Sequence, residues 1–182
     1  MSPRRVLVLA LATQAVLIAA AWGLSRLLQL PPHWGQLPRD AAIGVAGALA
    51  LAGVNYLMLT RAPSNWLVDG VRAVYHELLV PLFSRMGPLS IIAVGAAAGV
   101  GEEWLFRGVV QPLVGLVAAS VLFGLAHVGG RPMAAFGVWA SAMGLILGTL
   151  ATLTGGLTAP IVAHGVYDIL ALQFLRRGVH IE

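Results

Sequence analysis

The chain has 182 residues, of which 59% are hydrophobic and only 10% are charged. A typical soluble domain carries about 25% charged residues, so the composition excludes an ordinary soluble domain and indicates a membrane protein. We attribute the formal net charge of +4 to arginines that orient the helices, and we expect no nucleic-acid partner. The sequence contains no cysteine, which excludes disulfides, thiolate catalysis and cysteine-bound metals.

Six apolar segments predict helices that cross a lipid bilayer, which takes about 20 residues. They are residues 6–24, 41–59, 89–111, a short fourth segment at 113–128, 133–153 and 157–175. The first segment also has features of a signal peptide, with two arginines before it and Ala19-Ala20-Ala21 near its end, although it is long for one. The fold class we predict is all-α, a polytopic transmembrane helix bundle of about six spans that forms one domain over residues 1–182.

Residues 61–88 have a different pattern, in which apolar and charged side chains alternate at helical spacing. The pattern predicts an amphipathic helix lying at the membrane surface, bent near Pro81; an ordinary loop helix is the alternative. We assign His76 and Glu77 to its polar face and not to a functional site.

Small residues and prolines mark particular points within the spans. Gly95 and Gly99, and likewise Gly144 and Gly148, form GxxxG patterns, which predict close packing of helix backbones. Pro112 should end or kink the third span, because proline disfavours helical backbone in the residue before it.

The distribution of arginines predicts the orientation of the bundle. If the N-terminus is inside, eight arginines fall on the inside and two on the outside, so both termini are predicted to be cytoplasmic. The inside set is Arg4, Arg5, Arg61, Arg72, Arg85, Arg131 in the predicted turn 129–132, Arg176 and Arg177, and the outside set is Arg26 and Arg39.

Three charged residues interrupt the third apolar segment, within residues 101–108. Glu103 and Arg107 are four residues apart, so they share a helix face and can form an ion pair. Glu102 is rotated by about 100° from Glu103 and has no local partner. Charges within a span are costly and usually functional, although a charged helix end that reaches water would also explain them.

Two further polar sites lie in later spans: His127, one turn after Phe123, and His164, one turn before Asp168. Either histidine alone could be a satisfied structural residue. Carboxylates and imidazoles on three helices of one bundle together indicate a site for acid–base or metal chemistry. Symmetric spans would separate Glu102 and His127 in depth by about 12 Å at 1.5 Å per residue, so the short fourth helix should lie off centre or be longer than residues 113–128.

The three motifs resemble those of the CAAX prenyl protease 2 and bacteriocin-processing (CPBP, or Abi) family of intramembrane endopeptidases. The resemblance covers residues 89–175 and rests on Glu-Glu-x-x-x-Arg, Phe-x-x-x-His and His-x-x-x-Asn/Asp, which stand here as Glu102, Glu103 and Arg107, then Phe123 and His127, then His164 and Asp168. It implies hydrolysis of a peptide bond in a membrane-associated protein or peptide, such as a signal remnant, a bacteriocin-like peptide or a C-terminal sorting anchor. It also implies an integral protein of the bacterial inner membrane.

In that family the first glutamate would activate a water molecule, so the resemblance gives this role to Glu102, with His127 assisting. His164 and Asp168 would stabilise the oxyanion. Many relatives have Asn at the position of Asp168, and an ionised Asp can only accept hydrogen bonds. Asp168 is therefore either protonated and donating, or ionised and orienting His164; we favour the second.

The residues leave the cofactor and the function class open. Glu102, His127 and His164 could supply a His-His-Glu zinc set, but the same groups suffice for metal-free general-base catalysis, which we favour. A non-catalytic immunity or scaffold protein of the same fold is the alternative function. A proton-coupled carrier is a further alternative, although it would usually show inverted repeats.

Overall fold

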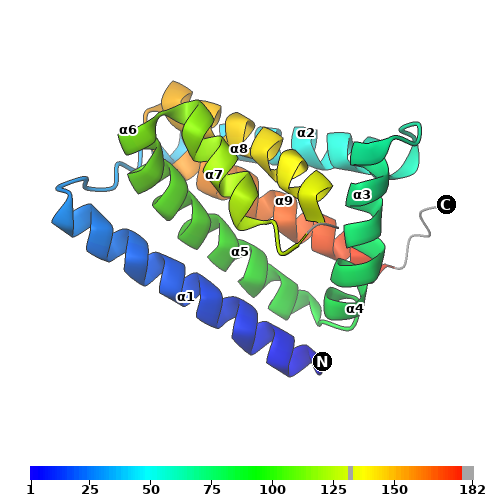
Figure 1. Ribbon diagram of the computed structural model, residues 1–182. Coiled ribbons are helices and arrows are strands. Elements are labelled where there is room, and N and C mark those ends of the chain that lie inside the picture. The colour runs from blue at the N-terminus through cyan, green and yellow to red at the C-terminus, as the bar shows by residue number, and fades with distance from the viewer. Residues whose placement is uncertain (131–132, 178–182) are drawn as a thin grey trace.

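The computed structural model describes residues 1–130 and 133–177, and all regular secondary structure in these ranges is helical (Figure 1). The predicted turn at 129–132 is described only as far as Gly130, since Arg131 and Pro132 lie outside the described residues. The elements in chain order are α1 (Pro3–Leu27), α2 (Leu37–Thr60), α3 (Trp66–Val74), η1 (Tyr75–Leu79), α4 (Val80–Phe83), α5 (Pro88–Leu105), η2 (Phe106–Val110), α6 (Gln111–Val114), α7 (Leu116–Ala126), α8 (Ala134–Thr154) and α9 (Thr158–Arg176).

Five helices are long and apolar enough to cross a membrane: α1, α2, the continuous helix Pro88–Val114, α8 and α9. Many of their outward-facing side chains are large, apolar and exposed, among them Val16, Leu49 and Leu89. An exposed apolar surface of this extent marks contact with lipid. The prediction of an all-α, polytopic membrane protein is therefore confirmed.

The predicted short fourth span is the 11-residue helix α7. At 1.5 Å per residue it is about 16 Å long, roughly half of a hydrocarbon core of about 30 Å. Figure 1 shows α7 running from α6 only part of the way toward α3. The helix ends partway along the bundle, and His127 is its C-terminal cap. The fourth helix is thus shorter than predicted.

Two π-helical segments, η1 and η2, each come just before a proline, Pro81 and Pro112 respectively. The amide of Val80 bonds to the carbonyl of Tyr75, and that of Gln111 to the carbonyl of Phe106. Wider i→i+5 turns let the chain accommodate a residue without an amide hydrogen, and they often occur at functional sites. Of the two effects expected of Pro112, an end or a kink, the end is not found, because the helix continues to Val114 and ends at Gly115, which has φ +82°.

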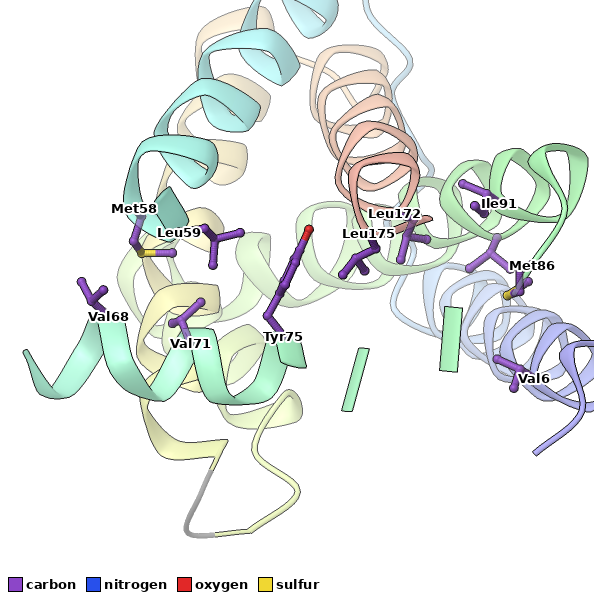
Figure 2. Packing of buried hydrophobic residues seen from close by; sticks show 11 residues of the cluster. Val6, Met58, Leu59, Val68, Val71, Tyr75, Met86, Ile91, Leu172 and Leu175 are labelled. Atoms are coloured by element: carbon purple, nitrogen blue, oxygen red, sulfur yellow. The ribbon is translucent and has the colours of Figure 1, made fainter. Parts of the chain in front are cut away.

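The amphipathic segment predicted at 61–88 is the helical run α3–η1–α4, and it stands across one end of the bundle (Figure 1). Figure 2 shows its apolar side chains meeting those of α2 and α9, with Tyr75 in the middle. The buried residues of this cluster are Val6, Met58, Leu59, Val68, Val71, Tyr75, Met86, Ile91, Val94, Leu172 and Leu175. Arg72 donates to the carbonyls of Met58, Leu59 and Ala62 and so caps α2. His76 and Glu77 are exposed, as predicted.

The start of α1 and the end of α9 lie at the same end of the bundle as α3 and α4, which we call the α3 end (Figure 1). The opposite end is closed by the loop between α1 and α2, which bonds to the turn between α8 and α9. The amide of Leu157 donates to the carbonyl of His33 over 2.8 Å, and Thr158 donates to the carbonyl of Trp34.

Close backbone contacts at glycines hold the core helices together, as the two GxxxG patterns predicted. Gly95 and Gly99 of α5 face α9; a Cβ at Gly99 would lie 2.6 Å from the carbonyl oxygen of Ile161. Gly144 of α8 faces Ser120 of α7, where a Cβ would lie 3.1 Å from Cα. The first contact holds together α5 and α9, two helices of the predicted site, and the second holds α8 against α7.

Gly99→Ala should lower the stability of the protein, because the new methyl group meets backbone atoms of α9 that no rotamer change can move. Overpacking of this kind costs about 1–3 kcal/mol. The matched control is Gly53→Ala, since nothing lies within 4 Å of a Cβ there and alanine favours helix. The measurement is the temperature at which half of the detergent-solubilised protein stays monodisperse. Equal midpoints for the two variants would contradict the packing argument.

Candidate active site

The site is built around the ion pair that the sequence predicted. Glu103 and Arg107, one turn apart across the junction of α5 and η2, lie with Nη1 3.1 Å from Oε1. Their side chains are 0% and 1% exposed. Arg107 also donates from Nη2 to the carbonyl of Gly144 over 3.0 Å. Burial of a charge is costly unless it is paired and hydrogen-bonded; here the partner lies one turn away on the same helical run, and a further acceptor for Arg107 comes from α8.

His164 of α9 approaches the same carboxylate oxygen. Its Nδ1 lies 2.7 Å from Oε1 of Glu103, and its side chain is 9% exposed. A carboxylate paired with arginine is an acceptor, so Nδ1 carries the proton and Nε2 faces the cavity. A fixed hydrogen bond at one ring nitrogen determines the protonation of the other nitrogen in the neutral ring.

His127 is oriented in the same way by the end of α7. Its Nδ1 lies 2.7 Å from the carbonyl oxygen of Phe123, which can only accept. Nδ1 therefore carries the proton here as well. The Nε2 atoms of His127 and His164 both face Oε2 of Glu102, at 3.7 and 4.0 Å.

Glu102 has one carboxylate oxygen anchored and one free to react. Oε1 accepts a hydrogen bond of 2.9 Å from Nε2 of Gln14 in α1. Oε2 is buried and has no hydrogen-bond partner among residues 1–130 and 133–177. The distances to the imidazoles are too long for direct hydrogen bonds but suit a bridging water molecule.

Asp168 lies one turn after His164, with Oδ2 3.6 Å from Nε2. This distance is too long for a hydrogen bond. The hydrogen bond that orients the His164 ring comes instead from Glu103. Asp168 faces the opposite ring nitrogen at ion-pair distance, so the orienting role that we expected for it stays a prediction. Asp168 borders the reacting edge of His164.

Phe123 packs beneath the charged cluster. The guanidinium carbon of Arg107 lies 4.5 Å from its ring centroid, and the rings of His127 and His164 lie at 4.7 and 5.9 Å. A cation over an aromatic face is attracted by the ring quadrupole. Phe123 thus supports three of the polar side chains at once.

A cavity of 290 Å³ leads from the site toward the α3 end. At one end it is lined by Gln14, Glu102, His127, His164 and Asp168, and further along by Val71, Tyr75, Leu79 and Phe83 of α3, η1 and α4. A second cavity of 410 Å³, at the opposite end of the bundle, reaches Arg107 but not Glu102. The buried ion pair lies between them, so Glu102 is reached from the α3 end.

The zinc set considered from the sequence consists of Glu102, His127 and His164. In the described part of the chain no group of three or more His, Cys, Asp or Glu side chains is arranged to hold a metal ion. The two Nε2 atoms and Oε2 face one another at 3.7 and 4.0 Å, a separation that also suits a water molecule. The absence of a metal from the reaction therefore stays a prediction.

The structure brings all six predicted site residues into one connected cluster: Glu102, Glu103, Arg107, His127, His164 and Asp168. Sequence reasoning missed Gln14 of α1, which lies 88 positions before Glu102 and donates a hydrogen bond to it from Nε2. The available signal was an amide side chain within the otherwise apolar first span, at a position that turns out to be buried.

Residues 84–170 match the family described as type II CAAX prenyl endopeptidase, Rce1-like. The chain is also 30% identical over 144 residues to the uncharacterized protein YpbD of Bacillus subtilis, an alignment that covers 76% of this chain and 73% of YpbD. No solved structure matches the chain. The chain therefore belongs to the Rce1-like CAAX prenyl endopeptidase family, and the resemblance drawn from the three motifs is confirmed. The matched region contains all six predicted site residues.

Arg107→Ala should reduce accumulation of the protein in membranes. Removing one partner leaves the carboxylate of Glu103 buried and unpaired, at a cost of about 3–5 kcal/mol. Adding Glu103→Gln should restore part of the loss, because the uncompensated charge is then gone. Quantitative immunoblotting of membranes measures both, and Arg61→Ala, on an exposed residue, is the control. Full accumulation of Arg107→Ala would show that the pair is not needed for folding.

Proposed function

We propose that this member of the Rce1-like family is an intramembrane endopeptidase that hydrolyses a peptide bond of a membrane-associated protein or peptide. One observation carries the proposal: Oε2 of Glu102 is buried, lacks a hydrogen-bond partner in the described chain, and is faced by the Nε2 atoms of two oriented imidazoles. A general base must lie within hydrogen-bond reach of the water that it deprotonates, or within one water of it.

In the proposed reaction Glu102 takes a proton from a water molecule held between Oε2 and Nε2 of His127. The resulting hydroxide attacks the carbonyl carbon of the scissile bond. In its cationic form His164 keeps its Nδ1 proton on Glu103 and donates its Nε2 proton to the developing oxyanion, the kind of stabilisation that contributes most in many hydrolases. The proton on Glu102 then passes to the leaving amine.

The substrate reaches Glu102 through the 290 Å³ cavity, from the α3 end. We propose that this end is cytoplasmic, because the arginines of the described chain concentrate there. Those at the α3 end are Arg4, Arg5, Arg61, Arg72, Arg85, Arg176 and Arg177, against Arg26 and Arg39 at the opposite end. The apolar walls contributed by Val71, Leu79 and Phe83 favour a substrate segment that is itself apolar, as at the end of a membrane anchor.

Glu102→Gln should abolish cleavage while the protein accumulates normally, since the amide has the shape of the carboxylate but cannot accept a proton. Loss of a general base typically costs 10²–10⁴-fold in rate. The protein and the variant are expressed in the same bacterial membrane, and new protein N-termini are identified by mass spectrometry. Termini that appear only with unaltered Glu102 identify substrates, and a fluorogenic peptide spanning one such site then gives kcat and KM with purified protein.

Two outcomes decide between an endopeptidase and a non-catalytic scaffold. If the protein is a scaffold, the N-termini found by mass spectrometry should be the same for the unaltered protein and for the Glu102→Gln variant. Cleavage of the fluorogenic peptide by purified Glu102→Gln at more than about a tenth of the unaltered rate would also remove Glu102 from the role of base.

Chelation should leave the activity unchanged, because the general-base route uses only side chains of the chain itself. Purified protein is dialysed against a zinc chelator, its rate on the fluorogenic peptide is measured, and its metal content is determined by elemental analysis. About one zinc per chain, lost together with activity and regained with it, would instead assign Glu102, His127 and His164 as ligands.

A further inference from the structure

We propose that Gln14 is a positioning residue for the reaction: its amide holds the carboxylate of Glu102 so that Oε2 points at the two imidazoles. This inference rests on the proposed function. It concerns a residue of α1, which lies outside the family match at residues 84–170 and to which the three family motifs give no role.

The first support is the hydrogen bond itself. Nε2 of Gln14 donates to Oε1 of Glu102 over 2.9 Å, between helices that are 88 residues apart in sequence. Within residues 1–130 and 133–177 this is the one hydrogen bond that the carboxylate of Glu102 receives. A carboxylate held by one oxygen has its second oxygen fixed in direction, and a donor to an ionised acceptor makes a stronger hydrogen bond than a neutral pair does.

The second support is the way Gln14 is seated. The residue is only 8% exposed. It belongs to α1, whose membrane-crossing segment is only 17% buried. Its Oε1 is buried without a partner in the described part of the protein, which is costly unless water reaches it. Both unpartnered oxygens, that of Gln14 and Oε2 of Glu102, belong to residues that line the 290 Å³ cavity.

The third support is the absence of a side chain at Gly101. A Cβ there would lie 2.6 Å from Oε1 of Gln14 and 3.2 Å from its backbone carbonyl oxygen. Glycine immediately before Glu102 therefore leaves the space that the amide occupies. An amide also keeps the same donor at every pH, since it does not titrate.

The test replaces Gln14 by methionine, which keeps the length and volume of the side chain but has no donor. With the fluorogenic peptide, Gln14→Met should lower kcat by about 10- to 100-fold, as loss of a residue that orients a reactive group typically does, with KM unchanged. Gln14→Glu should lower it at least as far, because it places a second carboxylate against the first. The control is Thr13→Val, on the neighbouring exposed residue, which should leave kcat within about twofold.

Gly101→Ala provides an independent route to the same state, because its methyl group displaces the amide of Gln14. Its loss in kcat should resemble that of Gln14→Met, and the two effects should not add in the double variant, since both remove one interaction. Infrared difference spectroscopy against Glu102→Gln isolates the carboxylate stretch of Glu102. This band should shift in Gln14→Met and stay in place in Thr13→Val.

Three results would overturn the inference: a kcat for Gln14→Met within about threefold of the unaltered protein, a fall in kcat that only follows the folded fraction, or a rise in KM at constant kcat. The last would make Gln14 a substrate contact. Failure of the proposed function has a different signature, because Glu102→Gln would then cleave as well as the unaltered protein while the infrared shift could still occur.

Discussion

The arrangement of the bundle depends on one buried oxygen, Oε1 of Glu103. It receives Nη1 of Arg107 from its own helix and Nδ1 of His164 from α9, and Arg107 continues to a carbonyl of α8. A charge placed within a membrane span without such partners costs several kcal/mol. The polar contacts therefore require α5, α8 and α9 to meet at this point; Gly99 lets α5 approach α9, and Gly144 lets α8 approach α7. Packing and electrostatics specify the same arrangement.

Two adjacent glutamates acquire different properties because a helix turns by about 100° per residue. Glu103 points into the bundle, where its Oε1 accepts from Arg107 and His164, while its Oε2 has no hydrogen-bond partner in the described chain. Glu102 points into the cavity and keeps one oxygen without a protein donor in the described chain. Glu103 contributes by fixing His164, and Glu102 is left for chemistry. One helical segment thus provides both the support of the site and its reactive group.

Much of this could be predicted from the sequence, where the determinants are local. The length of the apolar segments predicted the spans, and a separation of four residues predicted the Glu103–Arg107 pair. His127, His164 and Asp168 were recognised as polar residues within apolar spans. The parts that sequence reasoning missed depend on tertiary contacts. Spacing within α9 favoured Asp168 as the partner of His164, whereas the hydrogen bond comes from Glu103 on another helix. The length of α7 and the contact of Gln14 likewise depend on which helices are neighbours.

Hydrolysis within a membrane requires water at a depth where the surrounding lipid contains none. Backbone that is not helical, and polar atoms without partners, are tolerated there only beside other protein groups or a wet cavity. The end of α7 at His127 and the unpartnered oxygens of Gln14 and Glu102 are features of this kind, and all three residues line one cavity. Farther toward the α3 end the cavity wall becomes largely apolar, with Val71, Leu79 and Phe83. Such a wall favours water at the polar end, beside Glu102, and under the proposed function it leaves the remainder for an apolar segment of the substrate.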